Sequence, residues 1–319
     1  MEWVDAAALA LAVLLDRLLG EPRRWHPLIG LGYVIKAVEQ RLNRDCFSFR
    51  RRRLLGLIAL LLILAGVFCL VVPLLRFIGA STVAYLWFSA LSLYLVIGAR
   101  SLEEHALAVK GALTINDLAL ARVRVGYIVS RETGELDAVG VTRATLESVL
   151  ENGSDALLAP LFWFVVAGPV GAVGYRVINT LDAMWGYRNA RFQAFGWAAA
   201  RLDDWVNWIP ARLCALTYAA VASKGRGFGR QGLDCWRKQA GECESPNAGP
   251  VMACGAGALN LELGGAAIYH GQLLARPILG KGASPQPVDI DRALALLKRS
   301  MVLWASLYLL LAVCKQVLL

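Results

Sequence analysis

The sequence predicts an all-α, polytopic integral membrane protein with about five to six transmembrane helices, some broken or re-entrant, and with cytoplasmic helical loops. Hydrophobic residues make up 57% of the 319-residue chain and charged residues only 18%, against about 25% charged residues in soluble domains. Two uncharged runs, 54–75 and 77–99, are separated by the single residue Arg76. A helix needs about 20 apolar residues to cross the bilayer, so a soluble enzyme is not expected.

We expect one membrane-embedded domain, 1–319, with spans at about 4–19, 54–75, 78–99, 156–176, 205–222 and 300–318. The first segment lacks the basic start and the small-residue cleavage site of a signal peptide. Gly168–Pro169 interrupts the fourth segment, and Pro210 interrupts the fifth. Broken helices at membrane depth are tolerated where they are buried or line a polar cavity. This pair either crosses the membrane or re-enters and returns, which leaves the side of 179–204 open.

The basic residues set the expected orientation. Nine Lys and Arg lie in 21–53, six in 99–155 and ten in 223–300, and the positive-inside rule makes these segments cytoplasmic. Cytoplasmic loops are therefore expected at about 21–53, 100–155 and 223–299 of a multi-pass protein in the inner (cytoplasmic) membrane. The run Arg50–Arg53 reads as a topology anchor near anionic membrane lipid. Because these clusters account for most of the net charge of +9, no nucleic-acid partner is expected.

A ladder of charged residues precedes the fourth apolar segment. Arg143, Glu147, Glu151 and Asp155 follow one another at intervals of four, so on a helix they share one face. Like charges at this spacing are destabilising, and three carboxylates call for a counter-charge. Arg143 is one candidate, and Mg²⁺ is another because it prefers oxygen ligands. The alternative is a solvated helix face.

Two further polar groups lie beside the later apolar segments. Asp182 is followed by Arg188, and Asp203–Asp204 precedes Arg212. Ionisable residues beside or inside apolar spans are costly and are usually paired or functional. Each group is therefore either part of a site or an interfacial charge pair. Because adjacent residues cannot share one helix face, we expect only one of the two neighbouring aspartates to point into a site.

These residues and motifs together resemble the adenosylcobinamide-phosphate synthases of cobalamin biosynthesis, which are polytopic membrane enzymes. The resemblance runs from residue 5 to about residue 275 and rests on Asp16–Pro22 with His26–Pro27, Ser130–Thr133, Thr142–Arg212, Ser245–Asn247, Leu263–Gly265 and Tyr269. Two positions depart from the family pattern, because Glu21 and Glu132 stand where the family usually has Asp. Both keep the carboxylate, so the departure concerns the direct role of these two residues.

The resemblance implies an ATP-dependent amide-forming ligase. Such an enzyme joins aminopropanol phosphate, or aminopropanol, to a carboxylate of the corrinoid adenosylcobyric acid and forms adenosylcobinamide phosphate through an acyl phosphate. It implies Mg²⁺ as cofactor and ATP as cosubstrate, and it leaves an oligomer open. Phosphoryl transfer depends on positioning and on charge neutralisation by Mg²⁺ and cationic side chains.

We assign roles from the groups that this chemistry needs. Carboxylates suit catalysis or Mg²⁺, while arginines hold phosphates in bidentate geometry. The expected catalytic residues are Glu147, Glu151 and Asp182, and the expected metal ligands are Glu147, Glu151, Asp155 and Asp203. The expected substrate-binding residues are His26, Arg131, Arg143, Asn152, Asn179, Arg188, Arg212, Ser245 and Asn247.

Two other functional classes fit parts of the sequence. One is a non-catalytic membrane signalling protein of the same superfamily. The complete set of acidic and Asn residues argues against this class. The other is a transporter, since broken helices with midplane charges are typical of that class. In this chain the charges concentrate in loops and at span ends, which favours the enzyme.

Overall fold

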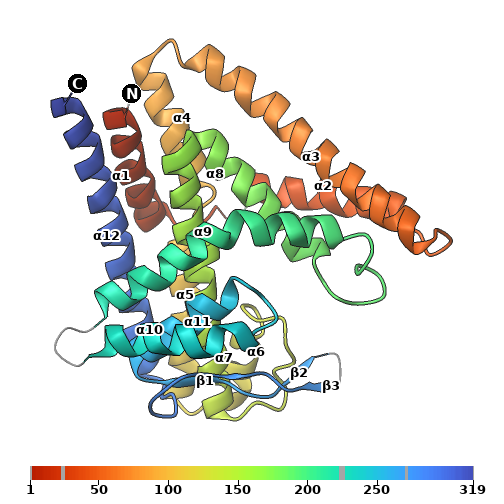
Figure 1. The fold of residues 1–319 in the computed structure, drawn as a ribbon, viewed down its shortest axis with the longest axis vertical. Coiled ribbons are helices and arrows are strands. Elements are labelled where there is room, and N and C mark those ends of the chain that lie inside the picture. Colours follow the sequence, from red (N-terminus) through yellow and green to blue (C-terminus); the bar gives the residue numbers. More distant parts are fainter. Residues whose placement is uncertain (1, 23–25, 223–226, 270–271, 319) are drawn as a thin grey trace. The chain divides into compact units, whose positions relative to one another are not determined.

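The computed structural model describes residues 2–22, 26–222, 227–269 and 272–318, and most of them are helical (Figure 1). The helices are α1 (Glu2–Leu19), α2 (Pro27–Leu42), α3 (Phe49–Ile78), α4 (Thr82–Tyr94), α5 (Ala99–Thr114), α6 (Leu118–Val125), α7 (Ala138–Gly153), α8 (Ala159–Trp185), α9 (Trp197–Val221), α10 (Phe228–Gln239), α11 (Ala248–Leu259) and α12 (Asp289–Leu318). A short π-helix, Ser154–Leu158, joins α7 to α8, and a 3₁₀-helix, Ala240–Glu242, follows α10.

Four helical segments of the described chain are long and apolar enough to cross a membrane: Phe49–Ile78, Thr82–Thr114, Ala138–Trp185 and Asp289–Cys314. They overlap four of the six predicted spans, so the helical membrane fold is confirmed. α1 and α9 form at the other two predicted positions but are not among the four segments. Membrane crossing by these two helices stays a prediction.

The segment expected as the last helical loop also contains short strands. β1 (Glu262–Gly264) pairs antiparallel with β4 (Ile278–Gly280), and β2 (Ala267–Tyr269) pairs antiparallel with β3 (Gln272–Leu274). The all-α prediction omits these strands. Each has three residues, which is too short for the alternation of apolar and polar residues to appear in a sequence.

Polar side chains fix where several helices begin. Ser48, Ser81, Asp117 and Asp137 accept a hydrogen bond from a backbone N–H in the first turn of α3, α4, α6 and α7, respectively. At α2 the buried His26 takes this role, since its Nδ1 accepts from the N–H of Leu28 at 3.1 Å. Such caps satisfy N–H groups that have no partner within the helix.

The helices form two compact units. Unit 1 consists of Met1–Gly98, Ala159–Asn207 and Tyr308–Leu319, and unit 2 consists of Ala99–Leu158 and Trp208–Leu307. The expected single membrane-embedded domain stays a prediction.

The core of unit 1 is built around Trp185 at the end of α8. Its ring packs edge-on against Phe195, with the ring centroids 4.9 Å apart, and both rings belong to a buried cluster with Leu60 of α3 and Ile35 of α2. Gly56 allows the close approach, because a Cβ there would lie 1.9 Å from the carbonyl oxygen of Phe195. The segment after α8 is thereby held against the first half of α3.

The predicted break in the fourth apolar segment is present, and there the helix folds back on itself. Gly168 has φ 59° and ψ −153°, a conformation that is essentially restricted to glycine, and Pro169 follows with no N–H to donate. A Cβ on Gly171 would lie 2.3 Å from the carbonyl oxygen of Trp163. Residues eight positions apart are about 12 Å apart along a straight helix, so the two halves of α8 form a hairpin (Figure 1).

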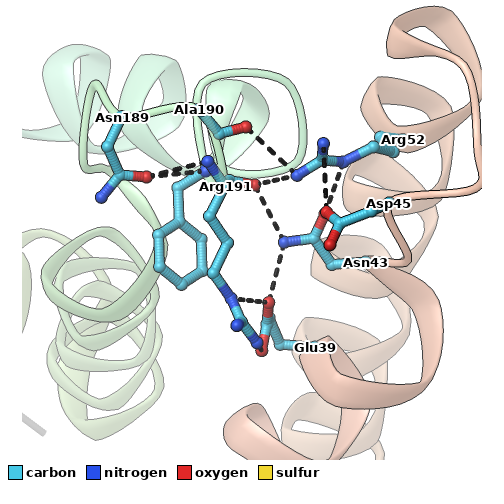
Figure 2. A network of polar contacts seen from close by, with 8 residues as sticks. Glu39, Asn43, Asp45, Arg52, Asn189, Ala190 and Arg191 are labelled. Atoms are coloured by element: carbon cyan, nitrogen blue, oxygen red, sulfur yellow. Dashed lines mark hydrogen bonds and ion pairs between the residues drawn. The ribbon is translucent and has the colours of Figure 1, made fainter.

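A polar network holds the segment after α8 to the basic start of α3 (Figure 2). The guanidinium of Arg191 donates to both carboxylate oxygens of Glu39, each at 2.9 Å. The carbonyl of Arg191 accepts from Asn43 at 3.0 Å and from the guanidinium of Arg52, which also donates to the carbonyl of Ala190 at 3.3 Å. Residues 189–191 therefore lie at the same end of unit 1 as the arginine-rich start of α3.

In unit 2, α7 and α11 are the most buried helices. Every residue of α11 is buried, and a Cβ on Gly255 would lie 2.7 Å from the side chain of Leu150 on α7. The π-helix after α7 changes the backbone hydrogen-bonding pattern. The hydroxyl of Tyr218 donates to the carbonyl of Leu150 at 2.9 Å, so this polar side chain is satisfied inside the core.

The cap of α2 makes a testable prediction about acid stability. Burial lowers the pKa of His26 from its ordinary value of 6.5. Glu21 raises this pKa and Arg176 lowers it, and the net shift is downward. The unfolded chain then binds a proton at pH values where the folded chain does not, so His26 lowers stability as the pH falls below about 6.5. Protonation of Nδ1 also removes the cap acceptor.

We expect His26→Asn, which keeps a capping oxygen, to reduce the loss of melting temperature between pH 7.5 and pH 5.5. His26→Ala serves as the control, since losing the cap costs about 1 kcal/mol and lowers the melting temperature at both pH values. Equal acid sensitivity of His26→Asn and the unchanged protein would contradict this role of the imidazole.

Candidate functional site

Half of the predicted site residues gather in two clusters, one in each unit. The arginine–glutamate cluster of unit 2 comprises Arg131, Arg143, Glu147, Glu151, Gly264, Gly265 and Arg276. The carboxylate cluster of unit 1 comprises Tyr175, Arg176, Asn179, Asp182, Asp203, Asp204 and Asn207.

Glu147 is the centre of the arginine–glutamate cluster. Its Oε2 accepts hydrogen bonds from the guanidinium of Arg131 and, at 2.8 Å, from that of Arg276. Its Oε1 accepts from the backbone N–H of Gly264 at 2.8 Å. The carboxylate is 4% exposed and the Arg131 side chain 8%. Both carboxylate oxygens are therefore already bonded, and Glu147 positions two arginines.

Two groups one turn either side of Glu147 have unused bonding capacity. Arg143 lies beside Gly265, where a Cβ would be 3.8 Å from its Nη1, and its buried Nε has no hydrogen-bond partner among the described residues. Glu151 lies near Glu147, Arg131 and Arg276. In the described part of the chain its carboxylate makes no hydrogen bond or ion pair. The cluster thus holds one available cation and one available anion.

The last member of the predicted ladder lies in a different backbone setting. Asp155 belongs to the π-helix, and Cys214 and Tyr218 are among its electrostatic neighbours. A π-helical turn has more residues than an α-helical turn, so the interval of four no longer returns a side chain to the same face. The described residues contain no group of three or more His, Cys, Asp or Glu side chains placed to hold a metal ion. The predicted Mg²⁺ ligands stay a prediction.

Three predicted substrate-binding residues of unit 2 contact one another. The guanidinium of Arg212 donates to Asn247 Oδ1 at 2.8 Å and to the carbonyl of Pro246 at 3.0 Å. The hydroxyl of Ser245 accepts from the N–H groups of Asn247 and Ala248, at 3.3 and 3.1 Å. These contacts fix the turn that begins α11.

Asn152 has a comparable local role on α7. Its side-chain amide donates to the carbonyl and to the hydroxyl of Ser148, both at 3.0 Å. The hydroxyl of Ser148 in turn donates to the carbonyl of Ile128 at 2.7 Å. Asn152 therefore supports the loop before α7 that carries Arg131.

The carboxylate cluster is organised by a chain of hydrogen bonds between α8 and α9. Asp203 accepts from Asn179 at 3.4 Å and from Asn207 at 2.9 Å. The hydroxyl of Tyr175 donates to Asn207 Oδ1 at 2.8 Å, and Arg176 donates to Asn179 Oδ1 at 3.3 Å. Asn207 is 1% exposed, so this chain orients Asp203 inside the unit.

Negative charge accumulates in the carboxylate cluster. Asp203 and Asp204 both act electrostatically on Asp182. Burial raises the pKa of Asp203 to about 6, the hydrogen bonds from Asn207 and Asn179 oppose this, and Asp204 adds to it. Asp204 forms an ion pair with Arg201 at 3.8 Å, and Arg188 is a second positive neighbour. A cluster of this kind favours a cationic ligand.

Two of the predicted site residues, Asp182 and His26, make structural contacts in unit 1. A Cβ on Gly186 would lie 2.0 Å from Asp182 Oδ1, so glycine at this position leaves room for that carboxylate. His26 caps α2, and Arg176 is one of its electrostatic neighbours. Its predicted substrate contact stays a prediction.

Sequence reasoning missed two residues that organise these clusters. Arg276 lies in no motif, and it contacts Glu147 across 129 positions of the chain. Asn207 follows Asp203 by four positions, a spacing along a helix that permits their contact. That spacing was a usable signal for Asn207, whereas nothing local marks Arg276.

Comparisons with known proteins give a consistent result. The profile of a family described as "CobD/Cbib protein" matches residues 9–297. The cobalamin biosynthesis protein CobD of Chromobacterium violaceum is 54% identical over 318 residues, which cover 97% of each chain. CobD of Stutzerimonas stutzeri is 52% identical over 294 residues, 92% of this chain and 93% of the relative. CobD of Mycobacterium tuberculosis is 38% identical over 291 residues, 91% and 90% of the two chains. No solved structure matches.

The contacts of Glu147 predict strong coupling with Arg276. Removing one partner of a buried ion pair costs about 3–5 kcal/mol because the other charge is left uncompensated. We therefore expect Glu147→Gln to lower the free energy of unfolding by about this amount, and Arg276→Met to lower it by less. The double variant is expected to lose less than the sum of the two, by about 0.5–3 kcal/mol.

Unfolding in mixed micelles titrated with SDS measures these free energies. Glu151→Gln is the matched control, because it removes an unbonded carboxylate one turn away and is expected to leave stability unchanged or slightly higher. Additive effects of Glu147→Gln and Arg276→Met would contradict the coupling.

Proposed function

The chain belongs to the CobD/Cbib family of cobalamin biosynthesis proteins, and on that premise we propose that it is an ATP-dependent amide ligase. In this proposal it joins aminopropanol phosphate to a carboxylate of adenosylcobyric acid and releases adenosylcobinamide phosphate, ADP and inorganic phosphate. With aminopropanol as the amine donor, the corrinoid product is adenosylcobinamide. The arginine–glutamate cluster is the observation that carries the proposal, because it places an available guanidinium and an available carboxylate around a fixed ion-paired centre.

The reaction needs two displacements. A carboxylate oxygen of the corrinoid attacks the γ-phosphorus of ATP, the bond to the β-phosphate oxygen breaks, and ADP leaves. The amine nitrogen then attacks the acyl carbon, the bond to the phosphate oxygen breaks, phosphate leaves, and the nitrogen loses a proton. Cationic side chains lower the barrier of the first step by neutralising charge on the transferred phosphoryl group.

The arginine–glutamate cluster supplies the groups for these steps. The available guanidinium of Arg143, beside Gly265, suits a phosphate. Gly264 and Gly265 have positive φ values of 77° and 82°, and the absence of side chains lets a ligand approach the backbone closely. We assign Glu151 the role of general base, because its carboxylate makes no hydrogen bond within the described chain. Glu147 keeps Arg131 and Arg276 in position.

The carboxylate cluster of unit 1 suits a cationic ligand. Asp182 and Asp203 are the carboxylates that we assign to it, with Asn179 orienting Asp203. No group of three or more acidic, His or Cys side chains in the described residues is placed to hold a metal ion. Mg²⁺ enters as the ion that accompanies ATP.

We further propose that residues 186–196 face the cytoplasm in the inner membrane. The hairpin at Gly168 returns the chain towards the side from which α8 starts. The network of Glu39, Asn43 and Arg52 ties residues 190–191 to the arginine-rich start of α3 (Figure 2). That start is cytoplasmic by the positive-inside rule. Both observations support the re-entrant alternative over a second crossing.

Glu151→Gln tests the catalytic assignment. We expect it to reduce amide formation at least about 100-fold, the usual lower limit for loss of a general base, while the protein remains folded in the membrane. The assay incubates purified protein with adenosylcobyric acid, aminopropanol phosphate and Mg-ATP, and it follows the amide product and ADP by mass spectrometry. Glu104→Gln, at an exposed glutamate on α5, is the matched control.

A wild-type rate in Glu151→Gln would reject the role of this carboxylate. Absence of amide product from the unchanged protein would reject the ligase proposal and favour a signalling protein or a transporter.

Cysteine labelling tests the proposed side of residues 186–196. In a cysteine-free background, we expect Ala190→Cys to resist a membrane-impermeant maleimide in spheroplasts and to react after permeabilisation. Restored Cys46, which is exposed between α2 and α3, is the same-side control. Ala80→Cys, in the exposed turn between α3 and α4, is the opposite-side control. Labelling of Ala190→Cys together with Ala80→Cys in spheroplasts would show that the segment lies outside.

A further inference from the structure

An apolar groove of about 490 Å³ runs between α2 and α3 within unit 1. Aliphatic side chains form most of its wall, namely Leu31, Val34 and Val38 of α2 and Leu62, Ile63 and Val67 of α3. Its volume is in the range of pockets that hold small molecules, about 300–1,000 Å³. None of these residues belongs to the arginine–glutamate or the carboxylate cluster.

One wall of the groove belongs to a candidate membrane span. α3 is a candidate membrane span, and only 28% of its most apolar 18-residue stretch is buried. Leu62 is 65% exposed and Val34 52% exposed. An exposed aliphatic side chain on a membrane span, such as Leu62 on α3, faces lipid tails, so an acyl chain suits the apolar wall of the groove.

A missing side chain keeps the groove open. Gly66 lines it, and a Cβ at this position would meet no atom within 4 Å. A side chain can therefore begin at position 66 without a clash at its Cβ, and we expect a larger side chain there to occupy part of the groove. Ala65, the preceding residue, is exposed and does not line the groove.

One end of the groove is basic. Arg41, in the last turn of α2, is the charged residue of the wall. Its guanidinium makes no ion pair or hydrogen bond with the residues that the structure describes. The chain continues from Arg41 through Arg44 to the arginine-rich start of α3. An exposed cation at the end of an apolar groove complements a phosphate attached to an acyl chain.

We propose that this groove binds an anionic phospholipid, with one acyl chain between α2 and α3 and the phosphate on the guanidinium of Arg41. The acyl chain contributes most of the binding free energy through its contact with the aliphatic side chains of the groove wall. The guanidinium contributes the preference for an anionic headgroup. A bound acyl chain also fills the space beside Gly66 and supports the packing of α2 on α3.

Native mass spectrometry of the full-length protein in detergent tests the proposal with phosphatidylglycerol and phosphatidylcholine of identical acyl chains. We expect a preference of about fivefold for phosphatidylglycerol, the effect of roughly one basic residue near an anionic lipid surface. Arg41→Gln is expected to bind both lipids equally, and Arg41→Lys to restore the preference. Gly66→Leu is expected to lose both lipids, while Ala65→Leu, the matched control, behaves as the unchanged protein.

Several results would overturn the proposal. They are equal binding of the two lipids by the unchanged protein, a preference that survives in Arg41→Gln, or full lipid binding by Gly66→Leu. If Gly66→Leu instead lowers the affinity for adenosylcobyric acid and leaves lipid binding intact, the groove belongs to a substrate. The melting temperature of each variant shows that a loss of lipid is not a loss of fold.

Discussion

The carboxylate of Glu147 joins segments of unit 2 that are far apart in the chain. It accepts hydrogen bonds from Arg131 in the loop before α7, from Gly264 on β1 and from Arg276 between β3 and β4. Without this carboxylate, two guanidinium groups with little solvent exposure would face each other, and buried charges are costly unless they are paired. Arg143 and Glu151, the two available groups of the cluster, lie on α7 one turn before and one turn after this central residue.

The need to pair buried polar groups also shapes unit 1, but in a different way. Polar side chains there are linked in series, from Arg176 through Asn179 to Asp203 and on to Asn207. Each hydrogen bond satisfies a group that would otherwise be isolated among apolar helices. The network of Glu39 and Arg191 does the same at the start of α3. Polar contacts therefore add to the apolar packing by which the helices of this unit meet.

The sequence predicts the helices and one face of α7 well, because both depend on local spacing. Arg143, Glu147 and Glu151 stand four residues apart, and the structure places all three in one cluster. It does not predict that Glu147 is bonded on both oxygens, since Arg276 is 129 positions away. The spacing argument also fails at Asp155, because a π-helix interrupts the α-helical repeat there.

The backbone conformation and the contacts of single residues could also not be predicted from sequence patterns. Gly168 and Pro169 mark a break in the fourth apolar segment, but the direction of the chain after the break depends on the contact of Gly171 with Trp163. His26 lies in a motif that predicts a substrate contact, and this contact stays a prediction, but the motif does not indicate that its imidazole caps α2. Such details follow from tertiary packing, which a short stretch of sequence does not encode.

The hairpin in α8 has a consequence for how the chain enters the membrane during synthesis. A hydrophobic segment that crosses would require the insertion machinery to move the following residues to the far side, and these include Arg188, Arg191 and Arg201. Transfer of arginines through the bilayer is strongly disfavoured. A segment that turns back at Gly168 needs no such transfer. Such a helical hairpin can insert into the bundle after α3 and α4 are in place, without moving the following residues across the membrane.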